Sequence, residues 1–341
     1  MDKKRIIVTG GAGYIGSHTC VELINAGYTP IIIDNFFNSE RFIVDRIEQI
    51  TGLRPDLIEV DCTDYSGLMT LLKGYKGIEG IIHFAAYKAV GESTQKPVDY
   101  YYNNIASTTA LLKLMNILGF NNFVFSSSCT VYGQPDELPV TENSPIKTAE
   151  SPYGRTKQMC EDVMKDYQKA NQDQKVVSLR YFNPIGAHSS SLIGELPRGV
   201  PNNLVPYITQ TAAGLRDHLT VFGDDYDTPD GTCIRDYIHV VDLAKAHVAA
   251  IEYLIRQKNG IYNVFNLGTG RGNSVLEVIR TFEEVAGLKL NYKIGPRRSG
   301  DIVKVYADVA KANKDLEWET ELDLKDALRD AWSWERSLKE N

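Results

Sequence analysis

The stretch Arg5-Ile-Ile-Val-Thr-Gly-Gly-Ala-Gly-Tyr-Ile-Gly16 decides the fold. Its short, mostly apolar beginning predicts a buried strand over residues 5–9. Gly10, Gly13 and Gly16 then permit a tight turn and let the backbone approach a bound pyrophosphate, which the following helix N-terminus would stabilise. Short glycine motifs are also common in ordinary strand–turn–helix units, so further evidence must come from the neighbouring chain.

The next predicted strand, residues 29–34, supplies that evidence because it ends in Asp34, 24 residues after Gly10. In a nucleotide-binding βαβ unit, an acid at this place accepts hydrogen bonds from the ribose hydroxyls and repels a 2′-phosphate. Asn35 follows it, where an arginine would favour a phosphorylated ribose. We therefore expect NAD rather than NADP as the cofactor.

Strands and helices alternate through the first half of the chain. Further strands are expected at 57–61, 80–84, 122–126 and 175–182, and helices at about 39–49, 65–73, 97–118 and 152–171. This alternation predicts an α/β fold with a doubly wound parallel (Rossmann) sheet. Ligands of such sheets bind at the carboxyl ends of the strands. Five features follow strand ends and should converge there: the Gly10 loop, Asp34, Asp61, residues 85–88 and Ser128.

The composition changes after about residue 184. Gly, Pro, Ser and Asn are frequent up to residue 237, with one short helix expected near 205–214. Later helices are expected at 240–256, 274–286 and 323–338, and a strand at 261–266. We expect residues 1–183 to form the Rossmann domain and 184–341 mainly a smaller, loop-rich substrate lobe, with about 238–266 returning to the Rossmann domain.

The segment Ser151-Pro-Tyr-Gly-Arg-Thr-Lys157 predicts a helix start that carries reactive groups. Ser151 would cap the helix, and Pro152 suits its first turn. Tyr153 and Lys157 are four residues apart, so they lie on one helix face. A nearby ammonium lowers the pKa of a phenol, and such a pair beside a serine hydroxyl can exchange a proton with an alcohol or carbonyl. An ordinary half-exposed Tyr/Lys pair is the alternative for this spacing taken alone.

Composition narrows the partners. The 341-residue chain has a net charge of −7 and 43% hydrophobic residues, so no basic surplus favours nucleic acid or an anionic membrane. Neither a signal peptide nor a membrane span is expected. Five scattered cysteines and six histidines show no metal-ligand spacing, and we expect reduced thiols, no metal and a cytoplasmic protein.

The chain as a whole resembles the extended short-chain dehydrogenase/reductase family, and within it the UDP-glucose (UDP-galactose) 4-epimerases. The glycine motif and Tyr-x-x-x-Lys are typical of the whole superfamily, whereas later blocks in their order and spacing point to the epimerases. The resemblance is carried by TGGAGYIGSH (9–18), HFAAYKAVGES (83–93), FSSSCTVYG (125–133), SPYGRTK (151–157), RYFNPIGAH (180–188), GVPNNLVPY (199–207), GTCIRDYIHVVDLA (231–244) and PRRSGD (296–301).

The resemblance implies a mechanism. Tyr153 would remove the proton of the sugar 4-hydroxyl while hydride passes from carbon 4 to NAD, and the 4-keto sugar would turn over and take hydride on its other face. Ser128 would hydrogen-bond the 4-oxygen. Lys157 would lower the pKa of Tyr153 and hold the nicotinamide ribose. Affinity would come from the UDP part, because a sugar that must rotate cannot be gripped tightly.

The resemblance also implies the binding residues. Those matching cofactor contacts are Gly10, Gly13, Tyr14, Ile15, Gly16, Asp34, Asn35, Asn38, Ser39, Asp61, Cys62, Phe84, Ala85, Lys88, Asn103, Tyr153, Lys157 and Tyr181. Those matching substrate contacts are Lys88, Ser128, Tyr153, Asn183, Asn203, Leu204, Phe222, Arg235, Arg298, Asp301 and Val305. Among the latter, the arginines match diphosphate contacts, Phe222 the ring against uracil, and Asp301 a ribose contact. A surface ion pair for Arg235 and simple core packing for Phe222 are the ordinary alternatives.

Two positions depart from the family's usual pattern. Cys129 stands where relatives often have alanine, and we expect it to pack as a small residue. Val305 stands where a large tyrosine excludes 2-acetamido sugars and a small residue admits them. We therefore expect some turnover of N-acetylated UDP-hexosamines. The resemblance further implies a homodimer, paired through the helices at 97–118 and 152–171.

The sequence leaves other functions open. A 4,6-dehydratase on this scaffold would carry Asp-Glu after the threonine beside the serine strand, whereas Cys129-Thr130-Val131 contains no acid. A decarboxylase or uronate epimerase differs at carbon-6 contacts, which the sequence distinguishes less firmly. A non-catalytic NAD-binding protein usually lacks the tyrosine, lysine or serine, and this chain keeps all three.

Overall fold

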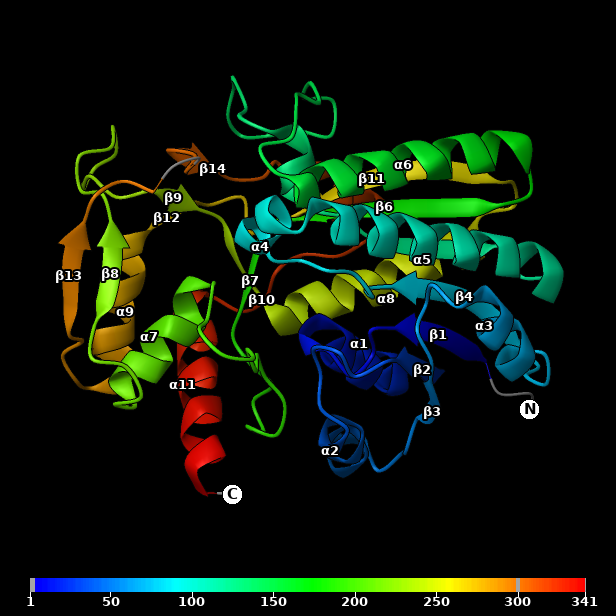
Figure 1. The fold of residues 1–341 in the computed structure, drawn as a ribbon, viewed down its shortest axis with the longest axis horizontal. Helices are drawn as coiled ribbons and strands as arrows, with labels where there is room; N and C mark the ends of the chain where they lie inside the picture. The colour runs from blue at the N-terminus through cyan, green and yellow to red at the C-terminus, as the bar shows by residue number, and fades with distance from the viewer. Residues whose placement is uncertain (1–3, 299–300, 341) are drawn as a thin grey trace.

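The computed structural model describes residues 4–298 and 301–340. Its centre is a sheet of seven strands in the order β11-β6-β5-β4-β1-β2-β3, and all neighbouring strands run parallel (Figure 1). The predicted doubly wound parallel sheet is therefore confirmed. Its strands are β1 (Arg5–Thr9), β2 (Thr29–Asp34), β3 (Asp56–Glu59), β4 (Ile78–His83), β5 (Asn122–Ser126), β6 (Lys175–Tyr181) and β11 (Ile261–Leu267).

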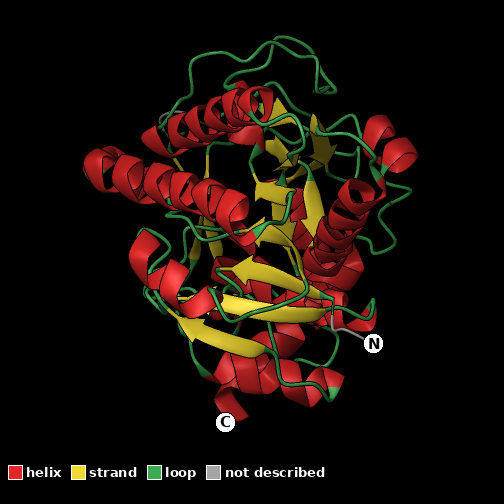
Figure 2. Cartoon of the chain, turned by 90° about the vertical axis from the view of Figure 1, so that its right-hand side faces the viewer, coloured by secondary structure: helices red, strands yellow, loops and turns green. Residues whose placement is uncertain are grey.

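Successive side chains of each strand enter two separate cores. In β1, Ile6 and Val8 belong to one core, whereas Ile7 belongs to the other. Because both faces are covered, the strands are continuously apolar rather than alternating. Figure 2 shows the sheet between its helices. The first core involves α1 (Tyr14–Asn25), α2 (Phe42–Thr51) and α8 (Val240–Arg256), and the second involves α3 (Tyr65–Leu72), α5 (Pro97–Leu118) and α6 (Pro152–Ala170).

A third core organises the smaller lobe, on the left of Figure 1. Its helices are α7 (Leu204–Ala212), α9 (Val275–Ala286) and α11 (Leu324–Glu340). Its strands are short: β8 (Leu219–Phe222) pairs with β13 (Tyr292–Gly295), and β9 (Ile234–Arg235) lies between β12 (Asn273–Ser274) and β14 (Lys304–Val305). The sequence predicts the three helices of this lobe, near 205–214, 274–286 and 323–338, but otherwise loops. These strands were missed because two to four residues are too few to show a period.

The lobe is joined to the carboxyl edge of the sheet. β7 (Asn183–Ile185) follows β6 after one residue and pairs with β10 (Tyr237–His239), which leads directly into α8. This connection brings the second lobe to the edge where the sheet strands end. The remaining elements are α4 (Val90–Gln95), the 3₁₀ turn η1 (Cys129–Tyr132) and α10 (Ala310–Asp315). Within the described ranges, no helix combines the length and the apolar character needed to cross a membrane.

Candidate active site

The glycine loop is packed too closely against backbone to admit side chains at Gly10 and Gly16. Gly10 has φ of +67°, and a Cβ added to it would lie 2.9 Å from the backbone nitrogen of Ala85. A Cβ on Gly16 would collide with the carbonyl of Gly10. Gly13 caps α1, and no side chain fills the cap. The helix start that contains Tyr14 and Ile15 therefore presents its free N–H groups and positive dipole end to a ligand.

Asp34 ties the glycine loop to the loop after β2. Its Oδ2 accepts from the backbone N–H of Ala12 at 3.0 Å, and its Oδ1 accepts from the Ser39 hydroxyl at 2.8 Å. Asn35 Nδ2 donates to Asp61 Oδ2 at 2.8 Å, so the ends of β2 and β3 meet as predicted. Nearby, Asn38 is exposed and Cys62 is buried. These groups fit the adenosine side of a dinucleotide.

The serine cap at the start of α6 sets the reactive face. Ser151 Oγ accepts from the backbone N–H of Gly154 at 3.1 Å, with proline in the first turn, as the sequence predicts. Tyr153 and Lys157 then point inward and are only 7% and 3% exposed. Ser128, two residues after the end of β5, is also buried and is near enough to Tyr153 for its side chain to lower the pKa of the phenol. The three proposed reactive groups therefore meet at the carboxyl edge of the sheet.

Burial controls the electrostatics of this group. It raises the pKa of Tyr153 well above that of a free phenol, and the hydrogen bond with Ser128 offsets only part of this effect. Burial also lowers the pKa of the Lys157 ammonium to about 8. Lys157 is not among the main causes of this shift, so its lowering of the Tyr153 pKa stays a prediction. Lys157 Nζ lies 5.8 Å from the Tyr153 ring centroid and donates to the carbonyl oxygen of Ser126 at 2.7 Å.

Other predicted cofactor residues surround these groups. The Tyr181 hydroxyl lies 2.8 Å from Ser126 Oγ, and the ring of Phe84 packs 4.6 Å from that of His247. Asn103 Nδ2 donates to Asn104 Oδ1 at 3.0 Å. Tyr181 and Phe84 thus lie at the ends of β6 and β4, whereas Asn103 lies on α5.

A second cluster lies in the smaller lobe. Asp301 accepts from Arg298 at 2.6 Å and lies 3.9 Å from Arg235. The Arg298 guanidinium stands over the ring of Phe222, which is 44% exposed. Two guanidinium groups suit a diphosphate, and an exposed ring suits a base. Ser299 and Gly300 of the PRRSGD block lie outside the described residues.

Glu195 links several predicted substrate residues, and the sequence analysis missed it. Its carboxylate accepts from Asn203 Nδ2 at 2.6 Å and lies 3.6 Å from Lys88 Nζ. Asn203 precedes the first residue of α7, Leu204, and Asn183 begins β7. No local pattern marks Glu195, since its neighbours in the sequence belong to an irregular loop.

Val305 lies close to the reactive serine turn. It is 5% exposed and packs with Val131, Tyr132 and Phe182 in a small core. Cys129 packs against the same core, as expected for a small residue, and burial raises the pKa of its thiol to about 12. Val305 also pairs with Arg235 across β14 and β9, so it lies between the serine turn and the arginine cluster.

Comparisons with known proteins identify the family of the chain. Residues 6–268 match the NAD dependent epimerase/dehydratase family. The chain is 49% identical over 337 residues to a UDP-glucose 4-epimerase of Dictyostelium discoideum, covering 99% of this chain and 97% of that protein.

Solved structures of UDP-glucose 4-epimerases are also similar to this chain. The UDP-glucose-4-epimerase of Stenotrophomonas maltophila, with bound NAD and formylated UDP-arabinopyranose, has a TM-score of 0.96 at 47% identity and 99% coverage of both chains. The UDP-glucose 4-epimerase of Bifidobacterium longum, in complex with NAD⁺ and UDP, has a TM-score of 0.93 at 48% identity and 98% coverage of both chains. The chain belongs to the NAD dependent epimerase/dehydratase family.

Proposed function

We propose that the chain interconverts UDP-galactose and UDP-glucose at sugar carbon 4 through a 4-keto intermediate. The observation that carries the proposal is the buried group of Ser128, Tyr153 and Lys157 beside the glycine loop. Its support is near-full-length similarity to UDP-glucose 4-epimerases at 47–49% identity. The dehydratase, decarboxylase, uronate epimerase and non-catalytic alternatives are not favoured by these relatives.

The cofactor fits the residues present. The glycine loop and α1 start would hold the pyrophosphate, and Asp34 the adenosine ribose, while Asp61 would lie at the adenine side. When bound, NAD supplies the acceptor and then the donor of the carbon-4 hydride. Lys157 and Tyr181 would meet the nicotinamide end, since both reach the strand end at Ser126.

Tyr153 would exchange the proton of the sugar 4-oxygen. Its raised pKa keeps the phenol protonated in the ligand-free protein, so it is ready to donate a proton. To accept one, the phenol must first ionise, and the buried Lys157 ammonium stabilises the phenolate more strongly than it would in water. Ser128 would hold the 4-oxygen against Tyr153 through its hydroxyl.

The arginine cluster would bind the nucleotide part. Arg235 and Arg298 offer several N–H donors to diphosphate oxygens, Phe222 a face to uracil, and Asp301 an acceptor to the ribose. Asp301 pairs with Arg298 and lies 3.9 Å from Arg235, so its single negative charge leaves the cluster with a net positive charge. Asn183, Asn203, Leu204 and Lys88 would complete the sugar and diphosphate contacts, with Glu195 holding two of them.

N-acetylated substrates are included in the proposal. Val305 packs against the serine turn and is much smaller than tyrosine, so it would obstruct a 2-acetamido group less than a tyrosine would. Turnover of UDP-N-acetylglucosamine is expected alongside that of UDP-glucose. Normal turnover of UDP-glucose with none of the N-acetylated sugar would contradict this part.

The proposal further includes a homodimer, located in the cytoplasm. Helices α5 and α6 pack side by side and leave a shallow groove of about 230 Å³, lined by Thr109, Leu112, Lys113, Asn116, Val163, Tyr167 and Asn171. Ile117 on α5 is 57% exposed, which supports pairing with a second copy. Light scattering coupled to size-exclusion chromatography checks the mass of the dimer.

The five free cysteines support a location in a reducing compartment, such as the cytoplasm.

The direct test uses purified protein and UDP-galactose without added cofactor, followed by separation of the two UDP-hexoses. Formation of UDP-glucose would support both the reaction and NAD retained through purification. Tyr153→Phe should lower the rate by roughly 10²–10⁴-fold. If the wild-type protein gives no UDP-glucose even with added NAD, the proposed function is wrong.

A further inference from the structure

A third ionisable residue continues the reactive face of α6. Tyr153, Lys157 and Glu161 recur at four-residue spacing, and Glu161 is only 1% exposed. A buried carboxylate is costly unless it is paired and hydrogen-bonded. The proposed mechanism gives Glu161 no task, so its partners decide what it does.

Glu161 binds the strand end that carries Ser128. Its Oε1 accepts from the Ser127 hydroxyl at 2.7 Å, and Ser127 is completely buried. Ser126, one residue earlier, supplies the carbonyl that receives Lys157. Lys157 and Glu161 lie one turn apart on α6, and they hold Ser126 and Ser127 at the end of β5. Ser128 is the next residue in the chain.

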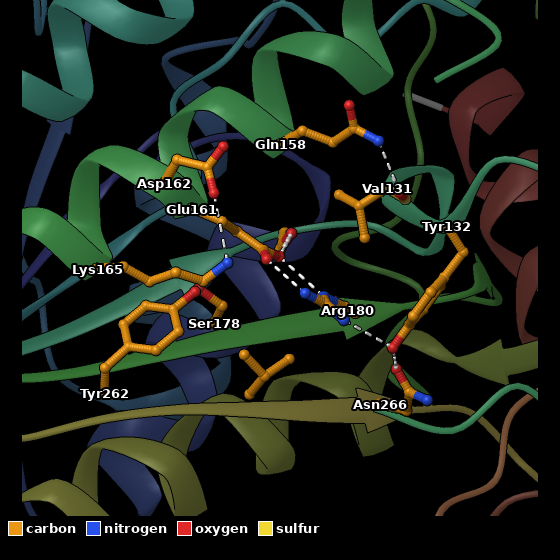
Figure 3. Close-up of polar contacts among 12 residues, drawn as sticks. Val131, Tyr132, Gln158, Glu161, Asp162, Lys165, Ser178, Arg180, Tyr262 and Asn266 are labelled. Carbon is orange, nitrogen blue, oxygen red and sulfur yellow. Dashed lines mark hydrogen bonds and ion pairs between the residues drawn. The ribbon is translucent and has the colours of Figure 1, made fainter. Parts of the chain in front are cut away.

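Arg180 fixes the carboxylate from the other side. Its Nε and Nη2 donate to the two Glu161 oxygens at 3.0 and 2.6 Å. Its Nη1 donates to the hydroxyl of Tyr132 at 3.0 Å, and that hydroxyl donates to Asn266 Oδ1 at 2.6 Å. Figure 3 shows these contacts, which run from Glu161 on α6 through Arg180 on β6 to Tyr132 and then to Asn266 on β11. A two-point ion pair leaves Glu161 little freedom to move.

We propose that Glu161 is a positioning residue for the proposed epimerisation: through Ser127 it sets the place of Ser128 relative to Tyr153 and Lys157. The inference rests on the proposed function, because the place of Ser128 matters only if its hydroxyl holds the reacting oxygen. Small displacements of a reacting group lower rates steeply, whereas substrate affinity comes from the distant arginine cluster. Loss of this contact should therefore lower kcat and leave KM unchanged.

The charge of Glu161 adds a second effect on the same face. Burial lowers the pKa of Lys157 to about 8, and the carboxylate one turn away opposes that lowering. Removing the charge should reduce the pKa of Lys157 further. The loss of kcat at alkaline pH should then begin at a lower pH, which a purely structural role of Glu161 would not produce.

The test compares Ser127→Ala with Ser178→Ala in the wild-type background. Ser178 is also completely buried and lies within hydrogen-bond distance of a hydroxyl, that of Tyr262 at 3.1 Å, but it does not contact Glu161. Ser127→Ala should lower kcat for UDP-galactose about 10-fold with unchanged KM and NAD content. Ser178→Ala should keep the wild-type kcat at a similar loss of Tm. Equal kcat values in the two variants would overturn the proposal.

Glu161→Gln supplies the second readout, because the amide oxygen can still accept from Ser127 while the charge is gone. On the alkaline side of the pH profile, kcat of this variant should begin to fall at a lower pH than kcat of the wild type. The same pH for both proteins would overturn the charge effect. A wild-type protein without epimerase activity would remove the proposed function and this inference together. That outcome is distinguishable from an active wild type whose Ser127→Ala variant is unimpaired.

Discussion

Lys157 Nζ donates to the backbone carbonyl of Ser126 at 2.7 Å, so the lysine is fixed to the strand end rather than to the phenol of Tyr153. It also lies 4.6 Å from the ring centroid of Phe125. The ammonium is thus held by groups that do not change during a reaction. This preorganisation lets its charge act on the phenolate without reorganisation.

Replacing Lys157 tests that role. Lys157→Met keeps the length of the side chain and removes the charge, so kcat for UDP-galactose should fall by roughly 10²-fold or more. Lys165→Met is the control, since Lys165 lies two turns along α6 and pairs with Asp162 near the surface. Comparable activity in the two variants would show that the charge of Lys157 is not needed.

Arg180 should be important for stability. Arg180→Met leaves the Glu161 carboxylate buried without its cation and should lower the free energy of unfolding by roughly 3–5 kcal/mol. Adding Glu161→Leu removes the stranded charge and should recover much of that loss. Urea unfolding of the single and double variants measures both. A double variant less stable than Arg180→Met would argue against this account.

Buried neutral histidines predict acid sensitivity. Burial lowers the pKa of His18 and His83 to about 3 and that of His247 to about 4. The unfolded chain binds these protons near pH ~6.5. Unfolding then takes up protons, so stability is complete above pH ~6.5 and is lost as the pH falls toward 4.

His247→Asn checks the sign. Asparagine can still reach the carbonyl of Leu243, which His247 Nδ1 contacts at 2.8 Å, but it does not titrate. Its urea midpoint should fall less steeply than that of the wild type between pH 6.5 and 4.5. Parallel slopes for the two proteins would mean that His247 does not contribute.

Arg198 connects the lobe to the loop that follows Asp34. It donates to the carbonyls of Phe37 and Ser39 at 2.6 and 2.8 Å and pairs with Glu40. Arg198→Ala should speed NAD release several-fold, because exposed charged contacts of this kind contribute about 1 kcal/mol. Arg54→Ala, which breaks exposed ion pairs within the Rossmann domain only, is the control. Release is followed by the NAD that remains after gel filtration, and equal rates would contradict the prediction.

Val305→Tyr should narrow the sugar site. A phenol ring beside the serine turn would fill the space proposed for a 2-acetamido group. Turnover of UDP-N-acetylglucosamine should fall at least 10-fold more than that of UDP-glucose, a difference of ~1.4 kcal/mol in transition-state binding. Equal losses on both substrates would indicate general damage to the site instead.

Elements with long or strongly marked patterns were predictable. β1, β2, β5 and α5 have the bounds that the sequence indicates, because apolar runs, glycine turns and a proline in the first helical turn act over a few residues. Asp34 and the Tyr153/Lys157 pair were identifiable because their spacing combines with local signals: a strand end after the glycine motif for Asp34 and a Ser-Pro helix start for the pair. The short strands of the smaller lobe were not, since their pairing partners lie up to 73 residues away along the chain.

The sequence by itself therefore determined the parallel sheet, the cofactor class and the reactive residue types. Only the tertiary structure decided how these residues influence one another. It showed that burial raises the pKa of Tyr153, that Glu195 joins Lys88 and Asn203, and that Glu161 reaches Ser127 across 34 positions. The physical reason is that pKa values and ion pairs depend on desolvation and on contacts between distant segments, which local spacing does not specify.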